Sequence, residues 1–179
     1  MTIRTLKSMF NPRSIAIIGR GKQDDDLAAL LEHNLIDAGF KGPVLPVNPD
    51  RRAVAGVLAY RNVASLPETP ELAISTLPLA EGPALIDALG ARGTRAVLLL
   101  SHERLNGRQD DEALKQALLA AAKPYQLRIL GPDRLGMAIP VNGINATLSH
   151  TPLIPGSISV VTQSSTMPVS YTHLRAHET

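Results

Sequence analysis

The chain has 179 residues, no cysteine and a formal net charge of +2, and 44% of its residues are hydrophobic although only 3% are aromatic. This length suits one α/β domain and the beginning of another, with a core of Leu, Ile, Val and Ala. The lack of cysteine excludes disulfides and thiolate chemistry and fits a cytoplasmic protein. Neither a basic run with interleaved aromatic residues nor a membrane-length apolar run occurs, so we expect no nucleic-acid or membrane partner.

A buried strand, a glycine turn and a helix open the predicted fold. Residues 15–18 read Ile-Ala-Ile-Ile, residues 19–22 read Gly-Arg-Gly-Lys, and a helical pattern begins at Leu27. Such a unit can bind phosphate, because glycine lets the backbone approach a ligand and helix N-termini attract anions. The third glycine of the dinucleotide fingerprint is missing, since position 24 is Asp. The turn alone therefore fits a nucleotide-type ligand and a plain βα turn equally well.

Four further strands and their helices follow at regular intervals. The expected strands are 44–47, 72–76, 96–100 and 127–130, and the expected helices are 6–10, 27–38, 79–92 and 110–123. Pro46 indicates that the second strand lies at a sheet edge, or that Pro46 stands at the end of the strand. The pattern of residues 54–60 does not distinguish between helix, strand and loop. The alternation predicts an α/β fold with a Rossmann-like, doubly wound parallel sheet.

The loops after the five strands meet at one edge of such a sheet, and ligands bind at that edge. Arg51 and Arg52 follow the second strand, where they either reach a ribose phosphate or lie in a surface loop. Thr76 ends the third expected strand, as part of a ligand channel or as an ordinary strand end. His102 beside Glu103 suggests an acid–base pair or a solvated loop. No spacing of histidine or carboxylate predicts a metal site.

Periodicity is lost from residue 140 to residue 155, and residues 158–165 then repeat the opening theme of a buried strand followed by small polar residues. We read this as the first strand of a truncated second domain. The expected division is a first domain over 1–139, a linker and second-domain start over 140–168, and a tail over 169–179. The tail looks like translated sequencing adapter and is left out of the fold prediction.

Several motifs stand along the chain: they are Asn-Pro-Arg-Ser-Ile-Ala-Ile-Ile-Gly at 11–19, Gly-Pro-Val-Leu-Pro-Val-Asn-Pro at 42–49, Leu-Gly-Pro at 130–132, Leu-Gly at 135–136 and Asn-Ala-Thr at 145–147. In combination they resemble the N-terminal CoA-binding domain of NDP-forming acyl-CoA synthetases, a domain related to the succinyl-CoA synthetase α subunit. Residues 160–165 resemble the entry to that family's flavodoxin-like second domain. Residues 42–70 look most like the bacterial protein lysine acetyltransferases, which carry a C-terminal GNAT domain.

The resemblance implies that the ligand is CoA or acetyl-CoA, and that the missing C-terminal domains of the same polypeptide complete an acetyltransferase or an NDP-forming acetate–CoA ligase. The segment itself would bind a CoA thioester without catalysing a reaction. The implied contacts are Gly19, Arg20, Gly21, Lys22, Asn48, Pro49, Arg51, Arg52, Thr76, Leu77, Pro78, Ser101, Gly131, Pro132 and Asp133. No catalytic residue is implied.

Two alternatives remain open. In an NAD-dependent oxidoreductase, an acidic residue near the end of the second strand would bind the ribose hydroxyls. Asn48 and Pro49 stand there, with two arginines nearby, which argues against NAD but leaves NADP open. The chain also departs from the resembled family at Arg20, Lys22 and Asp133, and these departures allow a structural domain that has lost its ligand.

Overall fold

The computed structural model describes residues 4–21, 27–100, 109–132, 136–149, 154–157, 159 and 161. Three of the predicted contacts, Lys22, Ser101 and Asp133, lie outside these residues, as do the tail and most of the strand expected at 158–165.

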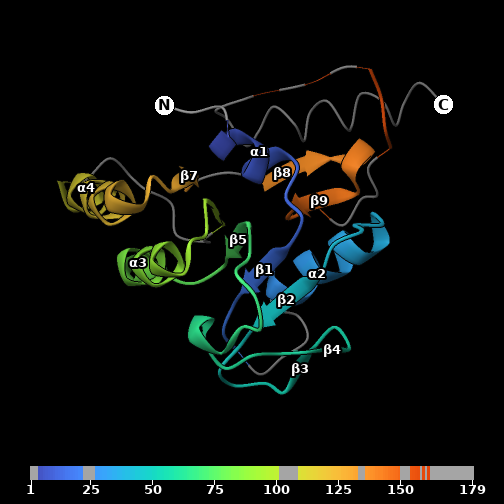
Figure 1. Ribbon diagram of the computed structural model, residues 1–179, viewed down its shortest axis with the longest axis horizontal. Helices are drawn as coiled ribbons and strands as arrows, with labels where there is room; N and C mark the ends of the chain where they lie inside the picture. Colours follow the sequence, from blue (N-terminus) through green and yellow to red (C-terminus); the bar gives the residue numbers. More distant parts are fainter. Residues whose placement is uncertain are drawn as a thin grey trace.

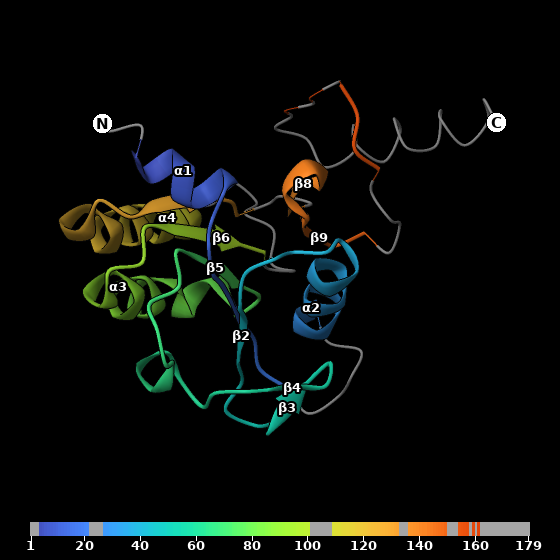
Figure 2. The ribbon, with the colours of Figure 1, turned by 45° about the vertical axis from the view of Figure 1, so that its right-hand side comes forward.

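Five parallel strands form the central sheet, in the order β2-β1-β5-β6-β7 (Figures 1 and 2). They are β1 (Ile15–Ile18), β2 (Val44–Val47), β5 (Leu72–Ser75), β6 (Ala96–Leu99) and β7 (Arg128–Leu130). The predicted doubly wound parallel sheet is confirmed, and β2 with its proline lies at an edge. In chain order the parallel strands run 2-1-3-4-5, one of the two common doubly wound arrangements.

Helices cover both faces of the sheet (Figures 1 and 2). On one face lie α1 (Arg4–Phe10) and α2 (Leu27–Asp37), and on the other lie α3 (Gly82–Arg92) and α4 (Gln109–Ala122). Strand β1 supplies both layers, because successive side chains of a strand point to opposite faces. Ile15 and Ile17 pack in the α2 layer, whereas Ala16 and Ile18 pack in the α3 layer.

Smaller elements fill the connections. The ambiguous segment after β2 forms a short antiparallel hairpin of β3 (Ala53–Val54) and β4 (Val57–Leu58), and Tyr60 then pairs with Val47 at the sheet edge. The helix expected over 79–92 is divided into a 3-10 turn, η2 (Leu79–Glu81), and α3. Two further 3-10 turns are η1 (Val63–Ser65) and η3 (Lys123–Tyr125).

A second antiparallel hairpin lies where the sequence predicted only a loss of periodicity. Strand β8 (Gly136–Ile139), turn η4 (Pro140–Asn142) and strand β9 (Ile144–Thr147) pack beside α2. Met137, Ile144 and Ala146 are buried in the same core layer as β1 and α2. The boundary expected after residue 139 therefore falls inside this hairpin.

Candidate functional site

The candidate site lies at the carboxyl edge of the sheet, between β1 and β5. The chain leaves β1 toward β2 on one side, whereas β5 leads to β6 and β7 on the other. Ligands of open α/β sheets bind in the crevice at such a switch point. Two backbone hydrogen bonds join the ends of the three strands at this place. Thr76 N–H donates to Ile18 O at 2.9 Å, and Gly19 N–H donates to Val47 O at 3.0 Å.

Gly19 is required here by the approach of α2. A Cβ built on Gly19 would lie 2.6 Å from the Ala28 Cβ and 3.1 Å from the Thr76 Oγ1. Real Cβ atoms do not come this close, so any side chain at position 19 would push the first turn of α2 away from the strand. The glycine thus allows the beginning of the helix to pack directly against the end of β1.

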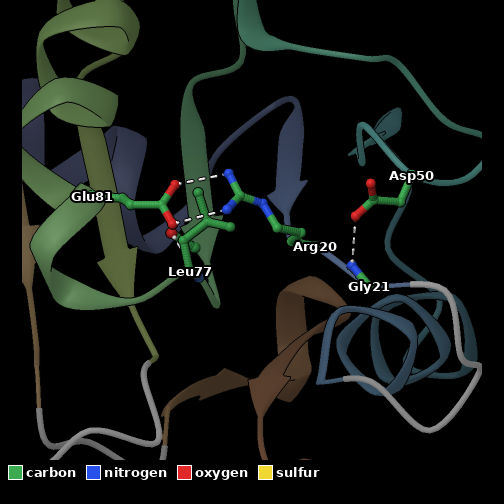
Figure 3. Close-up of polar contacts among 6 residues, drawn as sticks. Arg20, Gly21, Asp50, Leu77 and Glu81 are labelled. Atoms are coloured by element: carbon green, nitrogen blue, oxygen red, sulfur yellow. Dashed lines mark hydrogen bonds and ion pairs between the residues drawn. The ribbon is translucent and has the colours of Figure 1, made fainter.

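Asn48 joins the loop after β1 to the loop after β2. It is only 1% exposed, its Nδ2 donates to Gly21 O at 3.3 Å, and its Oδ1 accepts from Asp50 N–H at 2.9 Å. Gly21 has φ +127°, a conformation that glycine adopts without strain. Its N–H donates to the Asp50 Oδ2 at 3.3 Å (Figure 3). The two loops are therefore held together by a buried amide and a carboxylate.

Arg20 extends from the end of β1 toward Glu81, at the start of α3 (Figure 3). Its Nη1 and Nη2 donate to the Glu81 Oε1 and Oε2 at 3.2 and 3.0 Å, a two-pronged ion pair that spans the switch point. Sequence reasoning missed both Asp50 and Glu81 as site residues. Each of these acidic residues lies in the segment after a strand that neighbours β1, and this position could have indicated them.

The remaining predicted contacts are spread along the same edge. Thr76 and Leu77 adjoin the β1 loop, and their N–H groups donate to Ile18 O and to the Ser75 Oγ. Pro78 O accepts from Glu81 N–H at 3.0 Å. On the β2 side, Pro49 and Arg52 are exposed and Arg51 is half-buried. Gly131 and Pro132 follow β7, so that β6 separates them from the switch point.

The described residues contain no cluster of three or more histidine and carboxylate side chains placed to hold a metal ion. Within the same ranges, no helix has both the length and the apolar character needed to cross a membrane.

Comparison with known proteins identifies what this arrangement resembles. A family model described as "CoA binding domain" matches residues 13–140, which run from the turn before β1 to the first residue of η4. The structure of the dinucleotide-forming acetyl-coenzyme A synthetase 1 of Ca. Korarchaeum cryptofilum, in its apo form, superposes with a TM-score of 0.86. It is 26% identical in sequence, and the match covers 97% of this chain and 37% of that chain.

Two curated relatives are ligases or synthases of CoA thioesters by name. The α subunit of the ADP-forming acetate–CoA ligase I of Pyrococcus furiosus is 26% identical over 170 residues, which are 93% of this chain and 37% of the relative. A trans-feruloyl-CoA synthase from an unknown prokaryotic organism is 29% identical over 164 residues, 87% of this chain and 23% of the relative. The chain thus spans well under half the length of each relative.

Proposed function

The chain belongs to the CoA binding domain family, and on this premise we propose that CoA or an acyl-CoA lies along the carboxyl edge of the sheet, with its pyrophosphate at the loop after β1. The observation that carries the proposal is the position of that loop. It opens at the switch point between β1 and β5, and the matched residues enclose the complete parallel sheet. Open α/β sheets bind their ligands at this place.

We propose that the site recognises the CoA moiety and not the acyl group. The two curated relatives carry different acyl groups in their names, acetate and trans-ferulate, while CoA is common to both. The matched family and these relatives favour CoA over the dinucleotide of an oxidoreductase. The predicted contacts at Lys22, Ser101 and Asp133 remain part of the proposal, since each follows the end of a predicted strand.

For the longer protein, we propose an NDP-forming acyl-CoA ligase in preference to a lysine acetyltransferase, because the relatives reported above are by name a ligase, a synthase and a synthetase. The present chain supplies the CoA-binding part, and a second α/β domain begins near residue 158. This division extends the resemblance noted at residues 160–165.

Isothermal titration calorimetry of the 179-residue chain tests the proposal. We expect one CoA to bind per chain and NAD and NADP to bind more weakly. No heat with CoA, or tighter binding of NAD or NADP, would contradict it.

A further inference from the structure

We propose that Glu81 and Asp50 compete with the ligand for the anion-binding groups of the β1 loop, so that CoA binds by displacing two of the protein's own carboxylates. The inference rests on the proposed function, and it names a regulatory property of that site: an affinity held down by internal competition. Two independent contacts carry it.

The first contact is the ion pair between Arg20 and Glu81. A guanidinium presents two parallel N–H donors that fit a carboxylate and a phosphate equally well. Both prongs of Arg20 are engaged by the two Glu81 oxygens at 3.2 and 3.0 Å. Arg20 follows the end of β1 at the switch point, where the pyrophosphate is proposed to bind. Glu81 therefore holds the donor pair that a phosphate would use.

The second contact is the hydrogen bond from Gly21 N–H to the Asp50 Oδ2 at 3.3 Å. Backbone N–H groups of a glycine turn are the usual donors to a bound phosphate. Here a carboxylate from the neighbouring loop accepts this hydrogen bond. The Asn48 Oδ1 accepts from the backbone N–H of Asp50 and so orients that residue. The carboxylate thus takes the place of an anionic ligand at the turn.

The ion pair can open at low cost. The Arg20 and Glu81 side chains are 56% and 38% exposed, and ion pairs of this exposure contribute little to stability. Arg20 can therefore exchange Glu81 for a phosphate without disturbing the core.

A double-mutant cycle on Arg20 and Glu81, measured by calorimetry with CoA, tests the competition. We expect Glu81→Gln to bind CoA about two- to fivefold more tightly than the unmodified chain, and Arg20→Ala to bind it more weakly. In the Arg20→Ala background, Glu81→Gln should change CoA affinity less than twofold, because Glu81 acts through Arg20. Asp50→Asn should also tighten binding.

Glu68→Gln is the matched control. Glu68 is exposed and lies before β5, at the amino ends of the strands. The substitution therefore removes the same charge as Glu81→Gln, but far from the site. It should leave the CoA affinity unchanged. If Glu81→Gln binds CoA no more tightly than the unmodified chain, or tightens binding equally without Arg20, the competition is refuted while the proposed function stands. If none of these proteins binds CoA, the proposed function itself fails.

Discussion

A side chain at Gly19 would collide with Ala28, since the two Cβ atoms would lie 2.6 Å apart. Because α2 begins at Leu27, this contact sets the distance between the first turn of the helix and the end of β1. The loop geometry at the proposed phosphate site thus depends on the packing of two small residues. We therefore expect a substitution at Gly19 to alter both the stability of the domain and its binding of CoA.

We expect Gly19→Ala to lower the free energy of unfolding by about 1–3 kcal/mol, the usual cost of overpacking a well-packed site. Urea denaturation followed by circular dichroism measures the change. Gly156→Ala is the control, because a Cβ at Gly156 meets no atom within 4 Å. Equal stabilities of the two variants would show that the helix can move away freely.

The buried amide of Asn48 is expected to be essential for the order of both loops. Asn48→Ala removes the donor to Gly21 O and the acceptor for Asp50 N–H, and it leaves two polar backbone groups without these partners. We expect a loss of about 1–3 kcal/mol in unfolding free energy, together with weaker CoA binding. Asn11→Ala, at an exposed turn, should change neither quantity. A stable Asn48→Ala variant with unaltered CoA affinity would contradict this role.

Recognition of the ribose 3′-phosphate is predicted to come from the loop after β2. Arg51 is half-buried and Arg52 is exposed, and both follow β2 at the carboxyl edge of the sheet. One charge-assisted hydrogen bond contributes roughly 1.5–3 kcal/mol, or about 10- to 100-fold in affinity. Calorimetry should therefore show CoA binding more tightly than dephospho-CoA by about this factor.

The Arg51→Ala, Arg52→Ala double variant should lose most of that preference, and added salt should reduce it, since the loop is exposed. The matched control is the double variant Lys41→Ala, Lys123→Ala. These lysines are exposed and precede β2 and β7, so they lie at the other edge of the sheet. Equal affinities of the unmodified chain for CoA and dephospho-CoA would remove the arginines from the site.

The β8–β9 hairpin should behave as part of the first domain. Ile144 is fully buried against the core layer of β1 and α2, so Ile144→Ala should lower the unfolding free energy by about 2–5 kcal/mol. Ile154 is 80% exposed, and Ile154→Ala should change the unfolding free energy by no more than about 0.5 kcal/mol. Chemical denaturation compares the two. A small effect of Ile144→Ala would indicate that the hairpin does not stabilise the sheet.

The hydrogen bond between Tyr125 and Asp87 is expected to make a small, pH-dependent contribution to the stability of the fold. The Tyr125 hydroxyl donates to the Asp87 Oδ1 at 2.8 Å, and this hydrogen bond raises the pKa of the phenol above its ordinary value. Because the folded-state pKa is the higher one, the stabilisation is fully present below the unfolded-state pKa of about 10. It is lost as the pH rises through the folded-state pKa.

Tyrosine absorbance titration measures this shift. Asp87→Asn should lower the pKa of Tyr125, and Tyr125→Phe should remove the corresponding part of the stability profile above about pH 10. A Tyr125 titration that is the same with and without Asp87 would contradict the assignment of the hydrogen bond.

The sequence by itself determined the sheet. Continuous apolar runs such as residues 15–18 leave a strand no stable place except between two layers, and the regular alternation with helices requires parallel strands. Pro46 indicated either an edge strand or a strand end, because proline cannot donate to a neighbouring strand, and β2 lies at the edge. The motifs that resemble the CoA-binding family were equally visible, and the family match over residues 13–140 agrees with them.

The β8–β9 hairpin was decided by tertiary contacts. Residues 136–147 have a weak alternation, with small residues and the turn pair Asn142-Gly143, which is too little to predict strands. Their strand structure depends on the burial of Met137 and Ile144 against α2 and β1, which lie more than 90 residues away in sequence. An isolated two-stranded hairpin is only marginally stable without such packing.

The internal partners of the site were also decided only by the tertiary structure. Sequence analysis placed Arg20 and Gly21 at a phosphate-binding turn, but it could not show that Glu81 and Asp50 already accept their hydrogen bonds. Arg20 and Glu81 are 61 residues apart, and Gly21 and Asp50 are 29 apart. Such pairs form because neighbouring parallel strands bring their carboxyl ends to one edge, and strand order is a property of the folded sheet rather than of any local pattern.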